Sequence, residues 1–399
     1  MSTKRLLALI SSIAVSALAV WAEIPERAIP FIFDSHIYIQ GVMADSFTVS
    51  LIYDTGADRL YLDKDYMAQS TFGKRPLKKG VATMGGAGNG GAKQCPIIID
   101  KIPLKMGDVV YSEQITPIIN LREILGRHLD GMIGNNALLK KPLMVNYCDG
   151  YLLPLDDLTP SMLEGYTKLP ARFINNRIDV ECELKIDSAQ SVKGAFRLDL
   201  GSGGTVALTN AARKTINLTG KPQASDYFSN MGVGGDGTNI NFRAESFKFL
   251  DQLHNVVVSA SSNTEGALSD RKYLGLIGNE ILCHYDLIID AAHNALYARR
   301  NNNADNAYQR SSKTHMGYID RTDITDGWIV NCIYDGGIAQ QAGFEIGDII
   351  LSINGRPVKD ISWEEQRKGL GLKGHTVYTV KKHDGQVVTY VLNIDNEII

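Results

Sequence analysis

The chain lacks a strong excess of either charge. Its 399 residues include 41 Lys and Arg against 44 Asp and Glu, which gives a formal net charge of −3 at pH 7. It contains no long basic run and no regular interleaving of aromatic with basic residues. Neither the electrostatic attraction nor the stacking side chains that nucleic-acid binding uses are indicated. We therefore expect no nucleic-acid partner.

Paired cysteines and metal-ligand motifs are also missing. The odd number of cysteines and their wide spacing do not suit a disulfide framework. No CxxC pair occurs, and the eight histidines include no HExxH motif. We expect neither a metal nor another cofactor, and we expect the cysteines to be small buried apolar residues. They are Cys95, Cys148, Cys182, Cys283 and Cys332.

Long apolar runs are absent beyond the N-terminus. Lys4 and Arg5 precede the apolar stretch 6–20, and Val20-Trp21-Ala22 suits a small-residue cleavage site. The pattern predicts a signal peptide over residues 1–22 and an exported protein, periplasmic or extracellular. An uncleaved N-terminal anchor is the alternative. No later segment is apolar enough to cross a bilayer, so we expect no membrane span after cleavage.

What the chain does contain is an internal repeat. Asp54-Thr55-Gly56-Ala57 has a near copy in Asp199-Leu200-Gly201-Ser202, at an offset of 199 − 54 = 145. Met132-Ile133-Gly134 is echoed by Leu276-Ile277-Gly278, at an offset of 278 − 134 = 144. The glycines that begin at Gly86 recur from Gly232, at an offset of 232 − 86 = 146. Three landmarks in one order at nearly one offset indicate a duplicated unit.

Both glycine clusters satisfy GxGxxG by letter. A dinucleotide site needs a helix after that pattern, whereas residues 95–99 and 239–242 are typical of strands, which disfavours nucleotide binding. Glycine permits positive φ and close backbone approach. We therefore predict one hairpin tip per unit, with Gly85, Gly86 and Gly88 in a flap over a bound chain. A merely flexible surface loop is the alternative.

The segments between these landmarks are mostly short β-rich runs bounded by turn residues. They predict a mostly β chain with two barrel-like units, over residues 28–157 and 158–300. Short helices are expected at 121–126, 135–139, 209–216 and 279–282.

The two Asp loops, each with its later apolar-apolar-Gly step, resemble a retropepsin-like aspartic protease with two lobes in a single chain. The resemblance covers residues 28–300 and implies two duplicated β-barrel lobes with a cleft between them. It implies a catalytic dyad of Asp54 and Asp199, which shares a proton and activates a water. The expected activity is then aspartic-type endopeptidase, with a polypeptide substrate.

The residues around the two aspartates can support such a dyad. Gly56 and Gly201 allow a tight turn and offer backbone amides to the carboxylates. The resemblance implies that the Thr55 hydroxyl bonds across to the opposite loop, whereas Leu200 in the matching place has no hydroxyl. Ser202 could donate to Asp199. Because a lost buried hydrogen bond costs about 1 kcal/mol, a weak or inactive peptide-binding relative is the alternative.

The C-terminal part has its own motifs. Residues 301–312 are polar and predict a linker. Beyond them, Ala342-Gly343, Gly347-Asp348-Ile349-Ile350 and Asn354-Gly355 resemble a PDZ domain of the bacterial, protease-associated kind, over residues 313–395. The resemblance implies that a peptide is bound as an added strand, often by its terminal carboxylate.

Gly317, Tyr318 and Ile319 are the candidate loop for that carboxylate in the C-terminal domain. A plain strand start at these residues is one alternative. A domain that only braces the protein is another. The chain as a whole could also be an interaction scaffold that acts through this domain alone.

Overall fold

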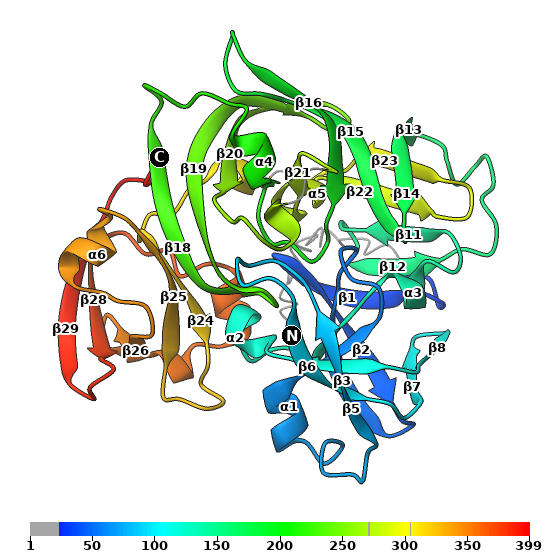
Figure 1. The fold of residues 1–399 in the computed structure, drawn as a ribbon, viewed down its shortest axis with the longest axis horizontal. Coiled ribbons are helices and arrows are strands. Elements are labelled where there is room, and N and C mark those ends of the chain that lie inside the picture. Colours follow the sequence, from blue (N-terminus) through cyan, green and yellow to red (C-terminus); the bar gives the residue numbers. More distant parts are fainter. Residues whose placement is uncertain (1–23, 270–271, 304) are drawn as a thin grey trace, which may run out of the picture.

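The computed structural model describes residues 24–269, 272–303 and 305–399. The predicted signal peptide over residues 1–22 lies outside the described residues. The prediction of a mostly β chain is confirmed. Figure 1 shows a blue and cyan N-terminal body, a green and yellow middle body and an orange and red C-terminal body. Within the described residues, no helix is long and apolar enough to span a membrane.

The sequence repeat is also a repeat of strand pairing. In the first unit, β3 (Phe47–Tyr53) runs parallel to β10 (Gly131–Ile133), which pairs antiparallel with β4 (Leu60–Asp63). In the second unit, β16 (Ser191–Leu198) runs parallel to β21 (Gly275–Ile277), which pairs antiparallel with β17 (Val206–Leu208). A short helix follows each glycine step, α3 (Asn135–Leu138) and α5 (Asn279–Leu282). The two units therefore share one local topology.

The other elements complete each unit. Those of the first are β1 (Ile29–Asp34), β2 (His36–Met43), α1 (Lys64–Gln69), β5 (Lys79–Met84), β6 (Lys93–Ile98), β7 (Ile102–Met106), β8 (Val109–Glu113), β9 (Thr116–Ile119), α2 (Arg122–Leu125), β11 (Leu143–Asn146) and β12 (Tyr151–Pro154). Those of the second are β13 (Thr167–Leu169), β14 (Ala171–Ile174), β15 (Arg177–Lys185), α4 (Asn210–Arg213), β18 (Gln223–Gly232), β19 (Gly235–Lys248), β20 (Gln252–Ser261), β22 (Tyr285–Asp290) and β23 (Ala295–Arg300). Of the four expected helices, α5 has the predicted bounds and the other three are shorter than predicted, and α1 was not predicted.

A shared sheet joins the two units. β11 pairs antiparallel with β22, and Met144 lies opposite Ile288. The offset of this pair, 288 − 144 = 144, is that of the sequence repeat, and Leu143 opposite Ile289 mirrors Val145 opposite Leu287. A pseudo-two-fold axis therefore passes through the centre of this strand pair. One hydrophobic core extends through both units.

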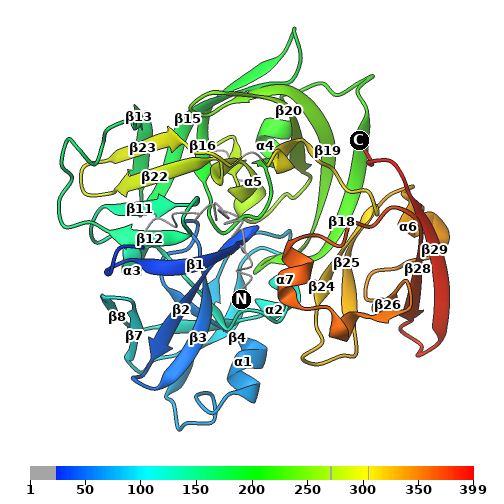
Figure 2. The same cartoon turned by 180° about the vertical axis from the view of Figure 1, so that it is seen from behind.

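The C-terminal body contains β24 (Met316–Asp320), β25 (Trp328–Tyr334), α6 (Ile338–Ala342), β26 (Ile349–Ile353), β27 (Arg356–Pro357), α7 (Trp363–Arg367), β28 (Gly374–Lys381) and β29 (Val387–Ile394). It has its own core, which includes the buried Trp328, Phe344 and Tyr378. Its strand β25 also pairs with β18 of the second unit, so that one sheet runs through both bodies. Figure 2 shows α7 on the side of the C-terminal body that faces the first unit.

Two sequence expectations differ from the structure. The predicted linker contains a short 3-10 helix, Ala307–Gln309, whose Tyr308 is buried and contacts the His284 ring edge-on, with ring centroids 5.2 Å apart. This segment is packed because one aromatic residue anchors an otherwise polar run. All five cysteines are free and four are buried, but Cys148 is exposed because it lies in the turn between β11 and β12.

Candidate functional site

The two aspartates face each other where the units meet. Asp54 follows β3 and Asp199 follows β16, and each accepts a backbone N–H through its Oδ1, from Gly56 at 2.6 Å and from Gly201 at 3.0 Å. A Cβ placed on Gly56 would lie 3.3 and 3.4 Å from the Asp199 oxygens. A Cβ on Gly201 would overlap the Asp54 carboxyl group. Each carboxyl group thus lies against the glycine of the opposite loop.

The electrostatics of this pair are unequal. Burial raises the pKa of Asp199 well above its usual range, and the Asp54 charge and a hydrogen bond to Asp54 raise it further. Burial also raises the pKa of Asp54, while hydrogen bonds from Gly56 and Asp199 oppose that rise. Because burial raises both pKa values, the two carboxyl groups titrate as a pair that keeps a proton to higher pH than isolated carboxyl groups would.

The Thr55 side chain forms hydrogen bonds to the opposite loop, whereas the Leu200 side chain forms none because it has no hydroxyl. The fully buried Thr55 hydroxyl donates to the Leu198 carbonyl at 2.8 Å and accepts the Leu200 N–H at 3.0 Å. The Leu200 side chain is fully buried in the apolar core. The Ser202 hydroxyl forms no hydrogen bond to Asp199 among the described residues; the Ser202 N–H donates to the Asp199 carbonyl at 3.2 Å.

Two asparagines that the sequence analysis missed support the loops. Asn135 Nδ2 donates to the Thr55 carbonyl at 3.0 Å, and Asn279 Nδ2 donates to the Leu200 carbonyl at 2.8 Å. Both side chains are buried, and their offset, 279 − 135 = 144, is that of the repeat. The sequence held a signal for them, because Asn follows the repeated Ile-Gly step in both units.

Two basic side chains donate hydrogen bonds to backbone carbonyls of the aspartate loops, each to the loop of the other unit. Arg177 Nε donates to the Gly56 carbonyl at 3.0 Å, and the His36 ring donates to the Gly201 carbonyl. Burial lowers the pKa of His36. Each residue is the first of its strand, His36 of β2 and Arg177 of β15. Nothing local in the sequence indicated these contacts.

The glycine clusters lie at the tips of two hairpins that meet. Gly85, Gly86 and Gly88 lie between β5 and β6, and Gly234 lies between β18 and β19. Gly90 donates to the Gly234 carbonyl at 2.8 Å, and Gly234 donates to the Ala87 carbonyl at 2.6 Å. Gly88 has a φ of 105°, which favours glycine. The two tips are joined by backbone hydrogen bonds, and the flap over a bound chain stays a prediction.

Apolar clusters flank the aspartate loops. The buried part of the first apolar cluster is Tyr38, Ile52, Ala57, Cys95, Ile119, Leu121, Leu129 and Met132, and its half-buried part is Tyr61, Met84, Leu125, Val233 and Trp363. The second apolar cluster is Leu268, Tyr273 and Leu276 with the half-buried Ala195, Ala207 and Met231. Met132 and Leu276 correspond in the repeat, at an offset of 276 − 132 = 144. Each unit therefore supplies an apolar surface beside its own aspartate loop.

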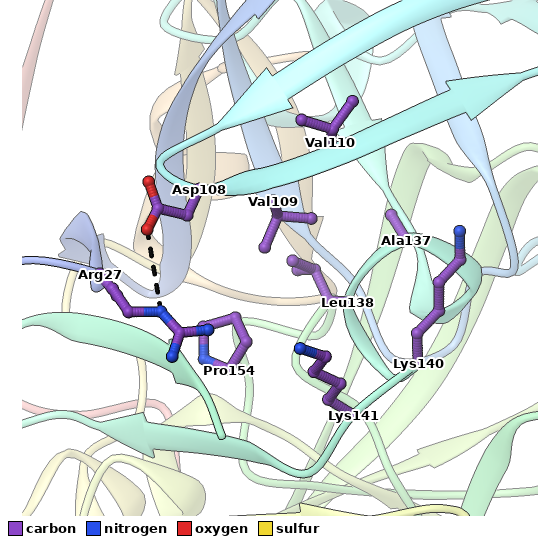
Figure 3. A pocket seen from close by; sticks show the side chains of 9 residues that line it. All are labelled: Arg27, Asp108, Val109, Val110, Ala137, Leu138, Lys140, Lys141 and Pro154. Carbon is purple, nitrogen blue, oxygen red and sulfur yellow. Dashed lines mark ion pairs between the residues drawn. The ribbon is translucent and has the colours of Figure 1, made fainter. Parts of the chain in front are cut away.

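A cavity of about 190 Å³ lies away from the aspartates, between Arg27, Asp108, Lys140 and Lys141 (Figure 3). Two of its three cations are already in ion pairs, because Arg27 and Lys141 both pair with Asp156 at 2.6 Å. We assign no role to it. In the part of the chain that the structure describes, no group of three or more His, Cys, Asp or Glu could hold a metal ion.

The predicted carboxylate-binding residues lie within a strand. Gly317, Tyr318 and Ile319 belong to β24, which among the described strands pairs only with β25. The first unit reaches the end of β24's free edge: the Arg127 N–H donates to the Asp320 carbonyl at 3.0 Å, and Arg127 Nε contacts the Asp320 carboxylate at 3.1 Å. This edge is therefore partly covered by the chain itself.

Comparison with known proteins identifies one part of the chain. The family model described as PDZ domain matches residues 329–366, which run from β25 to α7. No curated protein matches the chain. The C-terminal body therefore carries a PDZ domain, and such domains bind peptides.

Proposed function

We propose that the chain is an exported aspartic endopeptidase whose catalytic residues are Asp54 and Asp199, in a retropepsin-like arrangement of two lobes. The observation that carries this proposal is the facing pair of carboxyl groups, each of which lies against the glycine of the opposite loop. Burial raises the pKa of both groups, which supports a shared proton. The duplicated strand pairing around them supports the same conclusion. Residues 4–22 support export to the periplasm or the extracellular space.

The unequal pair suits general acid–base hydrolysis. Asp54, as the ionised partner, takes a proton from a water whose oxygen attacks the scissile carbonyl carbon. Asp199 gives its proton to the carbonyl oxygen, which yields a neutral tetrahedral intermediate. The C–N bond then breaks as the nitrogen takes a proton from Asp54, while Asp199 recovers one from the intermediate. The rate should fall when both carboxyl groups are protonated and when both are ionised.

The surrounding contacts support this chemistry by holding the loops and closing the site. Thr55, Asn135 and Asn279 satisfy buried backbone groups next to the aspartates and limit their movement. The joined hairpin tips would exclude bulk water once a chain is bound, which strengthens interactions inside the site. The PDZ domain would bind polypeptide.

The test is cleavage of an unfolded protein of known sequence, followed by mass spectrometry of the products. Asp54→Asn and Asp199→Asn should each abolish cleavage. Asp45→Asn is the matched control, because Asp45 is an exposed turn residue with a φ of 65°, which Asn also tolerates. Cleavage at the full rate by Asp54→Asn would contradict the proposal.

Leu200 favours one alternative, a peptide-binding protein or scaffold that acts through its cleft and PDZ domain without turnover. Half of the cross-axis bonding is absent because the Leu200 side chain packs in the core. Binding of peptides by the intact chain, with no cleavage from acid to neutral pH, would support this alternative.

A further inference from the structure

We propose that Trp363, carried by helix α7 of the PDZ domain, forms one wall of the substrate subsite beside Asp54 and sets the size of the apolar side chain bound there. The inference rests on the proposed peptidase function and adds to it a specificity residue from outside the two units. It starts from the presence of Trp363 in the first apolar cluster.

The position of Trp363 is tightly determined. It is the first residue of α7, which begins with a capping box: the Ser362 N–H donates to Glu365 Oε2 at 2.9 Å, and the Glu365 N–H donates to Ser362 Oγ at 3.3 Å. The indole N–H then donates to Asp34 Oδ2 at 2.7 Å. Asp34 belongs to the first unit, so this bond fixes the indole ring against the first unit.

The indole ring contacts two aromatic side chains of the first unit. It stacks on His128 with ring centroids 4.7 Å apart and an interplanar angle of 5°. It meets Tyr38 edge-on, with centroids 5.0 Å apart and an angle of 75°. Tyr38 lies opposite Ile52 in the strand pairing, and Ile52 precedes Asp54 by two positions. Trp363 thus reaches the strands that end at the candidate dyad.

The surface around Trp363 is suited to receive a ligand side chain. The first apolar cluster has a buried base, including Ala57 and Met132, and its rim residues Met84, Val233 and Trp363 are only half-buried. Met84 and Val233 come from the two hairpins whose tips meet. An apolar side chain of the substrate placed between Met84, Val233 and Trp363 would bind favourably, because it would bury the exposed apolar surface of this rim.

An exclusively bracing role fits Trp363 less well. The PDZ core is built from other side chains, and its own tryptophan, Trp328, is only 1% exposed. A cavity of about 400 Å³ adjoins the first apolar cluster and shares Cys95, Ile119 and Val233 with it. The cluster therefore borders open space on the side of these three residues.

The two sides of the cleft differ in this respect. The second apolar cluster draws all its described members from the second unit, and none of them comes from the PDZ domain. The two positions that flank a scissile bond would therefore meet different walls. A change at Trp363 should alter the preference on one side of the bond only.

The experiment compares Trp363→Leu and Trp363→Phe with the intact chain, by the products of an unfolded protein mixture. Leu is smaller than Trp and leaves space, so the kcat/KM ratio of Trp-containing over Leu-containing sites should rise about tenfold on one side of the bond. Trp363→Phe should give a smaller rise. Preference on the other side should not change. Trp328→Phe is the control, because it perturbs the PDZ core without contacting the first apolar cluster.

Unchanged preferences in Trp363→Leu, or the same shift in Trp328→Phe, would overturn the inference while leaving the peptidase proposal intact. If the intact chain does not cleave, the peptidase proposal fails instead. The subsite is then tested by calorimetry with peptides in which a hydroxyethylene group replaces the scissile amide and the flanking side chain is Trp or Leu. Equal Kd ratios for the intact chain and Trp363→Leu would overturn the inference.

Discussion

The hydroxyl of Thr55 accepts the backbone N–H of Leu200 at 3.0 Å, and this contact across the pseudo-two-fold axis is made from one side only. Thr55→Val removes the acceptor and leaves that N–H buried without its partner. We expect a loss of about 1–3 kcal/mol in the free energy of unfolding, measured by denaturant titration, and a lower kcat. Thr55→Ser keeps the hydroxyl and should retain both. Equal stability of the Val and Ser variants would contradict this prediction.

The raised pKa of Asp199 makes stability depend on pH. An unfolded Asp titrates near a pKa of about 3.9, whereas burial and the Asp54 charge keep Asp199 protonated in the folded chain to higher pH. The stabilisation from this retained proton is present below the unfolded pKa and is lost as pH rises through the folded pKa.

The corresponding variant is Asp199→Asn, which cannot ionise at this position. Its free energy of unfolding should therefore exceed that of the intact chain by an amount that grows from pH 4 toward neutral pH, by at most about 1.4 kcal/mol per pH unit for one proton. Denaturant titrations across this range provide the measurement. A difference that stays constant with pH would refute the raised pKa of Asp199.

The contact between hairpin tips should depend on the absence of a side chain at Gly88. Gly88 has a φ of 105°, and an added Cβ would overlap the backbone of Gly235. Gly88→Ala should therefore weaken closure and lower kcat/KM for peptide cleavage severalfold. Gly85→Ala is the matched control, because its Cβ would lie 4.0 Å from the nearest atom, on Ala92. Equal activities of the two variants would show that tip closure does not limit the reaction.

The free edge of β24 should bind peptides less tightly in the intact chain than it would without the contacts from the first unit. A strand added there must compete with Arg127, whose N–H already uses the Asp320 carbonyl. The Asp320 carboxylate also accepts from Arg127, from Gln366 at 3.1 Å, and contacts His128 at 3.3 Å. Peptide affinity therefore includes the free energy of displacing the first unit.

The double variant Arg127→Ala/His128→Ala leaves β24 and the backbone N–H of residue 127 in place, but it removes the two side chains that hold the first unit against the Asp320 carboxylate. We expect about a tenfold lower Kd, equivalent to about 1.4 kcal/mol, for a labelled peptide with a free apolar C-terminus, measured by fluorescence anisotropy. Arg59→Ala, on a charge pair elsewhere in the first unit, should leave the Kd unchanged. A weaker or unchanged affinity in the double variant would show that this edge is not limited by the first unit.

Local patterns in the sequence were enough for the repeat, the hairpin tips and the PDZ motifs. Glycines at tight turns, β-rich runs and the Asp-Thr-Gly step depend on residues close together in the chain, so they can be recognised without coordinates. Asn135 and Asn279 could have been found in the same way, because they share the repeat offset. Tyr308 shows the limit of composition, since one buried aromatic residue packs a segment that otherwise has the polarity of a linker.

The sequence by itself determined the mostly β class, the duplication that pairs Asp54 with Asp199, and the presence of a PDZ domain. Only the tertiary structure decided how these parts share surfaces. The Trp363 ring on His128 and Tyr38, the pairing of β18 with β25 and the contact of Arg127 with Asp320 all join residues far apart in the chain. Such contacts follow from the packing of whole bodies against each other, and no local propensity or spacing encodes them.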